Sequence, residues 1–263
     1  MNTQLEKRLL IITDEYTLDQ PQSIKWRVFH CTHYMLGGLL FITGSCIYFP
    51  LIINQNFNSP NGGGWLFTIG SFFFLLADIQ EWYSYRIGYY FKKYRTVYET
   101  IDDDLIHYSN NTPRGKYEQA ITELNLFMSV CGSALYLTGS IFFLQMFAKY
   151  LIIGEWLFII GSAVIYISQC WKLWRSGCTN VHNRQDQTFS IYNLLNNIPT
   201  FGVDFFAAIG GIFYFMGTVL YLPTFNKSDW DEPRVSRLFV AGGICFTISG
   251  LCLIYRYYST RQL

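Results

Sequence analysis

Asp78 is the ionisable residue whose position most suggests chemistry. It directly follows residues 65–77, which contain no charged side chain, and Gln169 lies within a second such stretch, residues 156–170. A polar group inside an apolar helix is costly to bury and usually marks a binding site or a path for ions. If their helices are neighbours, Asp78 and Gln169 form a polar site at one depth of an apolar bundle.

The acidic residues also have simpler interpretations, which the sequence leaves open. Asp78 could lie near the end of its helix and pair with Arg86 or Lys172. Glu155 and Asp204 each stand at the end of an apolar stretch. There we expect their carboxylates to be solvated or to face the positive end of a helix dipole.

A second set of residues could bind a metal ion. His30, Cys31 and His33 lie at the start of the first apolar stretch, and Cys178 and His182 follow the fourth. Thiolate and imidazole groups are zinc ligands, but this spacing matches no zinc motif. The sequence also contains no glycine-rich phosphate loop, His-Glu-x-x-His element or Gly-x-Ser-x-Gly elbow. We therefore expect no metal, no cofactor and no enzymatic activity.

Six apolar stretches must position these residues. Charged residues make up only 14% of the 263-residue chain, against about 25% in a typical soluble protein. The stretches without any charge are residues 37–53, 65–77, 126–148, 156–170, 205–222 and 238–255. With its flanks each reaches about 20 residues, which span a ~30 Å hydrocarbon layer as a helix. The seven tryptophans all lie outside the middle of these stretches, as expected at membrane boundaries.

Glycines recur in pairs seven residues apart along these stretches. Seven residues are nearly two helical turns, so each pair lies on one helix face. Small residues on a face let helices approach closely in lipid. We therefore predict helix packing at Gly37 and Gly44, Gly63 and Gly70, Gly132 and Gly139, Gly154 and Gly161, Gly210 and Gly217, and Gly243 and Gly250.

The glycine pattern is repeated three times along the chain, each time in a unit of two helices. The predicted fold is all-α, a polytopic membrane protein with six transmembrane helices arranged as three tandem helical hairpins. The predicted segments are an N-terminal segment 1–33, hairpin 34–82, polar connector 83–124, hairpin 125–174, connector 175–203, hairpin 204–257 and a tail 258–263. The aromatic and basic first half of the long connector is expected to continue the second span as a helix. All three hairpins share one orientation, unlike the inverted repeats of many transporters.

Lysine and arginine predict the orientation. Fifteen of the 19 basic residues fall on the side of the N-terminal segment, the two connectors and the tail, counting Lys172 and Arg256 at the adjoining span ends, and four fall in the opposite loops. Basic residues collect on the cytoplasmic side. Both termini are therefore expected on the cytoplasmic side of a plasma membrane or on the matrix side of a mitochondrial inner membrane. The formal net charge is only +1. We expect membrane lipids and other membrane subunits as partners, and no nucleic acid.

The repeat resembles the YrhK-like membrane-hairpin family. The family pattern is Gly-x-x-x-x-x-x-Gly-Ser in one helix and Gly-x-Trp-Leu-Phe-x-x-Gly-Ser at the start of the next. The matching segments are Gly37–Ser45 with Gly63–Ser71, and Gly132–Ser140 with Gly154–Ser162. The third unit departs from the pattern at Thr218, Arg237 and Gly243. The resemblance implies a hairpin architecture and lends no established activity.

These observations favour a structural or interaction role, one form of which is an accessory subunit of a larger membrane complex. The alternative is a channel or small-solute transporter. Its path would run between the hairpins near the intramembrane polar site at Asp78 and Gln169.

Overall fold

Six long helices make up most of the protein. The computed structural model describes residues 24–47, 59–95, 113–178, 188–195, 198–225 and 231–259. The long helices are α2 (Ile24–Ile47), α4 (Ser59–Arg95), α6 (Pro113–Phe142), α7 (Leu151–Gly177), α9 (Ile198–Tyr221) and α10 (Asp231–Ser259). A 3₁₀ helix, η1 (Gln145–Tyr150), joins α6 to α7, and the short helix α8 (Ile191–Leu195) precedes α9.

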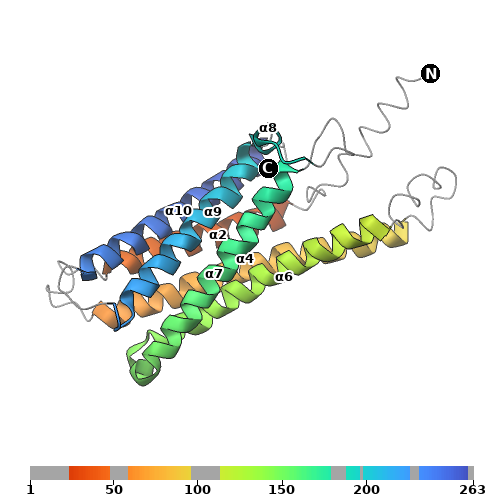
Figure 1. Ribbon diagram of the computed structural model, residues 1–263. Helices are drawn as coiled ribbons and strands as arrows, with labels where there is room; N and C mark the ends of the chain where they lie inside the picture. The colour runs from red at the N-terminus through yellow and green to blue at the C-terminus, as the bar shows by residue number, and fades with distance from the viewer. Residues whose placement is uncertain are drawn as a thin grey trace, which may run out of the picture.

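The six helices form a closed ring. Each long helix packs against the next one along the chain, and α10 also packs against α2. The antiparallel pairs α2–α4, α6–α7 and α9–α10 are three hairpins (Figure 1). We call the end where α2 begins and α10 finishes the terminal end, and the end where α2, α6 and α9 finish the hairpin end. The order of hairpins around the ring is therefore their order in the chain.

Five of the helices are long and apolar enough to cross a membrane. The corresponding segments are Gly62–Arg86, Ala120–Phe142, Gln145–Gly177, Ile198–Tyr221 and Arg234–Tyr258. Helix α2 is not among them, because its first half carries Lys25, Arg27, His30 and His33. The chain thus has the composition and helix lengths of an integral membrane protein.

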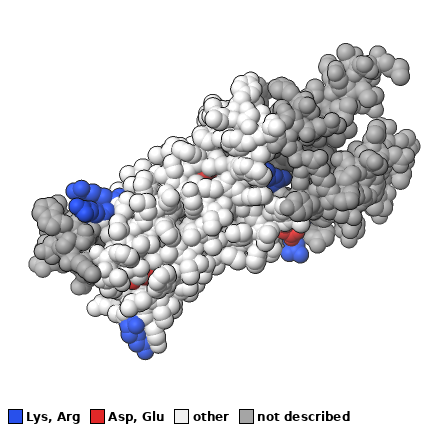
Figure 2. All heavy atoms as spheres, viewed as in Figure 1, with Lys and Arg blue, Asp and Glu red and all other residues white. Residues whose placement is uncertain are grey.

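The outer surface of the ring is apolar. Large hydrophobic side chains are exposed around it, among them Phe29 of α2, Phe72 of α4, Phe127 of α6, Trp156 of α7 and Leu251 of α10. Figure 2 shows one face of this surface, almost uncharged between the two ends of the bundle. Such a surface is costly in water and suits contact with lipid chains.

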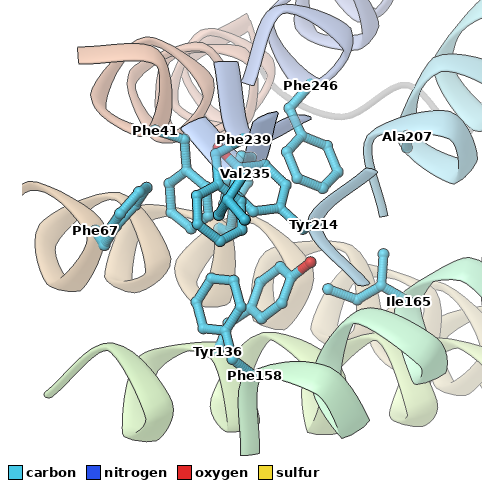
Figure 3. Close-up of a cluster of buried hydrophobic side chains, with 11 residues drawn as sticks. Phe41, Phe67, Tyr136, Phe158, Ile165, Ala207, Tyr214, Val235, Phe239 and Phe246 are labelled. Atoms are coloured by element: carbon cyan, nitrogen blue, oxygen red, sulfur yellow. The ribbon is translucent and has the colours of Figure 1, made fainter. Parts of the chain in front are cut away.

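Aromatic rings fill the centre of the ring of helices. The members of this aromatic cluster are Phe41, Phe67, Phe74, Tyr136, Phe158, Tyr214, Phe239 and Phe246, all buried (Figure 3). The rings of Tyr136 and Phe158 stack with their centroids 4.4 Å apart, and Phe41 meets Tyr214 edge to face at 5.1 Å. Offset and edge-to-face contacts are the favourable geometries for aromatic pairs.

The cluster arises from the repeat itself. Phe41, Tyr136 and Tyr214 each stand about one turn after the first glycine of the seven-residue pair in α2, α6 and α9. Four residues further on, a hydroxyl group donates a hydrogen bond to the carbonyl oxygen of each of these three residues. The donors are Ser45 (2.6 Å), Ser140 (2.7 Å) and Thr218 (2.8 Å). These hydroxyls are thereby satisfied within their own helices.

The helices run further than the predicted hairpins. Helix α2 begins at Ile24 rather than at residue 34, and α9 begins at Ile198 rather than at residue 204. The prediction that the aromatic and basic part of the long connector continues the second span is confirmed, because α4 extends to Arg95. The hairpins therefore project beyond the apolar layer at the terminal end.

Candidate functional site

Asp78 and Gln169 line the same cavity. This central cavity has a volume of about 20 Å³, which is room for one water molecule. Its lining comes from five of the six long helices and comprises Tyr34, Phe74, Asp78, Ser129, Ser133, Tyr136, Ile165, Gln169 and Phe246. Phe74, Tyr136 and Phe246 are also members of the aromatic cluster. The structure thus brings the two predicted polar residues together, beside the aromatic cluster.

Among the described residues, Asp78 forms no direct ion pair with a basic side chain, although Lys172 acts on it electrostatically. Its carboxylate accepts a hydrogen bond from the Ser133 hydroxyl of α6. The predicted ion pairs with Arg86 and Lys172 are wrong, because Lys172 Nζ binds Glu81 at 3.2 Å. Arg86 lies 3.8 Å from Glu123. Both basic residues lie closer to the terminal end, each beside an acid that the sequence analysis did not single out.

Gln169 is buried, and its side-chain oxygen accepts no hydrogen bond from the described residues. Its side chain is 7% exposed, and its Oε1 atom has no hydrogen-bond partner in the described part of the chain. Nearby, the Ser129 and Ser168 hydroxyls are 2.9 Å apart and bond to each other. A buried amide oxygen without a hydrogen-bond donor lowers the stability of the folded state. A cation or a hydrogen-bond donor in the cavity would remove this cost.

A charged cluster lies next to the cavity, toward the terminal end. Glu81 of α4 and Lys172 of α7 form its ion pair, with side chains 23% and 18% exposed. Lys172 also interacts electrostatically with Asp78 and with Asp204 of α9. His30 of α2 joins the group and bonds through Nδ1 to the hydroxyl of Tyr257 at 2.9 Å. Helices α2, α4, α7, α9 and α10 therefore all contribute a polar side chain here.

Sequence reasoning missed this cluster, although one signal was available. Glu81 and Lys172 stand at matching positions of the first two hairpins, equally far along the helix from Phe67 and Phe158. Matching positions of α4 and α7 face the same centre once the ring closes. Opposite charges at such positions are therefore an indication of an ion pair.

Two acidic residues predicted to be solvated or to lie at helix N-termini, Asp204 and Glu155, are buried. Asp204 is 7% exposed, because α9 begins at Ile198 and places it a full turn and more inside the helix. Glu155 is 1% exposed, and its Oε2 atom has no partner among the described side chains. It lies near the start of α7, where that helix packs against both α6 and α9. The solvated interpretation is wrong for both residues.

The histidines turn to separate partners. His33 donates from Nδ1 to Gln80 Oε1 at 2.9 Å, whereas His30 bonds to Tyr257. Cys178 closes the end of α7, and His182 lies outside the described residues. Within the described ranges, no three His, Cys, Asp or Glu side chains gather as metal ligands.

Glycines stand where the two helices of a hairpin meet. A Cβ atom at Gly37 would lie 2.9 Å from the Phe74 ring, and one at Gly217 would lie 2.7 Å from the Phe239 ring. At Gly139 it would lie 2.9 Å from the carbonyl oxygen of Gly154. Real Cβ atoms essentially never come this close, so these three positions have no space for a side chain.

The third hairpin uses a different glycine from the one predicted. A Cβ atom at Gly242 would lie 2.7 Å from the Tyr214 ring of α9. Gly70 and Gly161 face the partner helix of their hairpins in the same way. Gly243 and Gly250, the predicted pair, instead face side chains of α2, so they lie between hairpins. Gly243 and Gly250 thus stand at a helix contact, but one between hairpins, because the position of Phe239 determines which face of α10 turns toward α9.

A family model matches the first two hairpins. The model of the YrhK-like protein family matches residues 24–81 and again residues 119–176. The first match covers α2 and most of α4, and the second covers most of α6 and α7. No curated protein and no solved structure is significantly similar to the chain. The chain therefore contains two tandem segments that are similar to the YrhK-like protein family.

Proposed function

We propose that this protein is a six-span membrane protein with a structural or interaction role, acting as an accessory subunit of a larger membrane complex. It performs no reaction and conducts no solute. Its bundle presents an apolar outer surface to lipid and to partner subunits.

The aromatic cluster is the observation that carries this proposal. Phe41, Tyr136 and Tyr214 are fully buried at the centre of the ring, where a transport path between the hairpins would have to run. Interiors of this kind are as dense as organic crystals. A solute could pass only if several rings moved together, which argues for a rigid bundle.

Helix α2 completes the six spans of the proposal. It has 24 residues, as does α9, and a helix of that length is about 36 Å long. It packs along both α4 and α10, so it runs beside helices that are apolar enough to span. With six spans, both termini lie on one side, and the basic connectors favour the cytoplasm or the mitochondrial matrix.

Close approach at glycine is the proposed basis of the rigidity. Gly139 and Gly154 each leave no space for a Cβ atom beside the other's carbonyl oxygen, at 2.9 and 3.0 Å. Van der Waals contact across small residues is a main source of helix association in lipid. Close helix contacts of this kind favour a rigid scaffold over a channel whose helices must move apart to open.

The transporter alternative has one observation in its favour. Asp78 and Gln169 line one cavity, as a path through the polar site requires. Against it, the cavity holds only about 20 Å³, and aromatic rings lie between it and the hairpin end. We therefore rank it second.

Purification from the native membrane tests the proposal. A tagged chain is extracted in mild detergent and analysed by native mass spectrometry. We expect stoichiometric membrane subunits to remain bound, and a preparation that consists only of the single chain would contradict the accessory role. In a second arm, vesicles containing the protein are loaded with a fluorescent reporter of small ions. Flux above that of empty vesicles that Asp78→Asn abolishes would establish the transporter instead.

A further inference from the structure

The polar residues that line the central cavity all carry oxygen. They are Asp78 with its carboxylate, Gln169 with its amide, and Tyr34, Ser129, Ser133 and Tyr136 with their hydroxyls. Carboxylate, carbonyl and hydroxyl oxygens are ligands for hard cations. Four helices, α2, α4, α6 and α7, supply these groups, so they converge on one point rather than forming a stripe on one helix.

The unpartnered oxygen of Gln169 points to a bound group. It is buried, with the residue 7% exposed, and lacks a donor in the described part of the chain. A water molecule offers two donors. A cation satisfies every oxygen that reaches it at once, including the second oxygen of a carboxylate.

Charge also favours a cation. Glu81 is matched by Lys172, and Asp204 interacts electrostatically with Arg256 as well as with Lys172. Asp78 lies within the electrostatic range of Lys172, but its hydrogen bond comes from the neutral Ser133. An ionised carboxylate in an apolar bundle is costly unless a positive group offsets it.

The size of the cavity limits the choice of ion. A volume of about 20 Å³ accommodates one particle of the size of water, and a sodium ion is smaller than that, so it fits. Calcium takes 6–8 oxygen ligands, usually with several carboxylates, and magnesium keeps several of its waters. One carboxylate and little space favour a monovalent ion.

We propose that the central cavity binds one sodium ion through Asp78, Gln169 and the hydroxyls around them. The ion ties α4 to α6 and α7 at the depth where the packing changes from aromatic to polar. It exchanges through the terminal end, because the aromatic cluster lies on the other side. This inference is independent of the proposed structural role, since a scaffold and a transporter could both bind the ion.

Thermal unfolding of the purified full-length chain in detergent tests the site. Melting is followed in sodium chloride, potassium chloride and N-methyl-D-glucamine chloride at one ionic strength. A ligand that binds only the folded state raises Tm as its concentration increases. Once the concentration exceeds Kd, the stabilisation grows with the logarithm of the concentration. We expect sodium to raise Tm the most, and equilibrium binding of ²²Na⁺ to saturate at one ion per chain.

Three variants separate the site from general effects of salt. Asp78→Asn is expected to lose the sodium dependence, and Gln169→Leu to weaken the apparent affinity about tenfold, the value of one hydrogen bond to a charged group. Glu123→Gln makes the same acid-to-amide change at the surface, where Glu123 lies near Arg86, and should respond as the wild type does. If Asp78→Asn does not fold, Gln169→Leu decides alone.

Equal melting temperatures in all three salts together with no ²²Na⁺ binding would overturn the proposal and leave a water molecule in the cavity. Undiminished sodium binding in Gln169→Leu would equally overturn it, because the ion would then be held elsewhere. Neither result bears on partner subunits, so this inference can fail while the proposed structural role stands.

Discussion

Matching positions of the three hairpins carry different side chains beside the aromatic cluster. Measured along the helices from Phe67, Phe158 and Phe239, the first set is Asp78, Gln169 and Gly250. The next set toward the terminal end is Glu81, Lys172 and Leu253. The first two hairpins thus supply every polar group at these positions, and the third supplies none.

The ion pair between Glu81 and Lys172 can be tested by a double-mutant cycle. Lys172→Met leaves the partly buried Glu81 without its partner, which costs up to about 3 kcal/mol of the free energy of unfolding. The double variant with Glu81→Gln should recover much of that loss, because no unpaired charge is left. Reversible unfolding in detergent, followed by circular dichroism, measures all four proteins.

Additive losses in that cycle would show that the two side chains do not interact. The control is Arg86→Met, which removes the basic partner of Glu123 at a surface position with side chains 48% and 42% exposed. Exposed pairs contribute at most about 1 kcal/mol, so this variant should unfold almost like the wild type.

At the residue scale the sequence predicted part of the site. Asp78 and Gln169 stood out because each is polar within or directly beside a stretch without charge, and they do share a cavity. Glu81 did not stand out, and Lys172 did so only as a possible partner of Asp78, because both residues lie just past those stretches, at the ends of the predicted spans. Only the closure of the ring brings them face to face, and local sequence patterns do not describe that closure.

At the scale of elements, α6 and α7 approach each other closely at Gly139. Gly139→Ala places a methyl group 2.9 Å from the Gly154 carbonyl oxygen and 3.2 Å from the Phe158 nitrogen. Both atoms belong to the backbone and cannot rotate away. We expect a loss of about 1–3 kcal/mol in the free energy of unfolding, as for other overpacked sites.

Gly62→Ala is the matched control within α4. Its new methyl group would meet only the Ile47 Cδ1 atom, at 4.0 Å, and alanine is a better helix former than glycine by about 1 kcal/mol. We expect no loss of stability. If both substitutions were neutral, close approach at glycine would not hold the hairpins together.

The elements themselves were largely predictable, and the exception has a physical cause. Stretches without charge predicted the long helices, and glycine spacing predicted which helices pair. In α10, however, the seven-residue spacing selects Gly243 with Gly250, whereas Gly242, which meets Tyr214 of α9, has Val235 and Ser249 seven residues away. The inward face depends on where Phe239 enters the aromatic cluster, and that contact depends on Tyr214 in another helix.

At the scale of the whole molecule, the number of spans determines where the termini lie. Six spans place both ends of the chain on one side, whereas the five apolar helices alone would place them on opposite sides. We expect epitope tags at the two ends to be digested together when protease is added to one face of sealed native vesicles.

Digestion of one tag and protection of the other would instead mean that α2 does not cross the membrane. Solubilised vesicles, in which both tags must be cut, provide the control for tag accessibility. This experiment also identifies the side of the termini, which the basic connectors predict to be the cytoplasm or the matrix.

The closed ring of three hairpins has a consequence for symmetry. Three separate identical hairpins could build the same ring as a homotrimer around a threefold axis. Every residue near that axis would then occur three times, and three ionised carboxylates would repel one another at its centre. A single chain is free of this constraint, so it can place one Asp78 beside one Gln169 and one Gly250. Fusion of the repeats thus allows a lone negative charge at the centre of a threefold architecture.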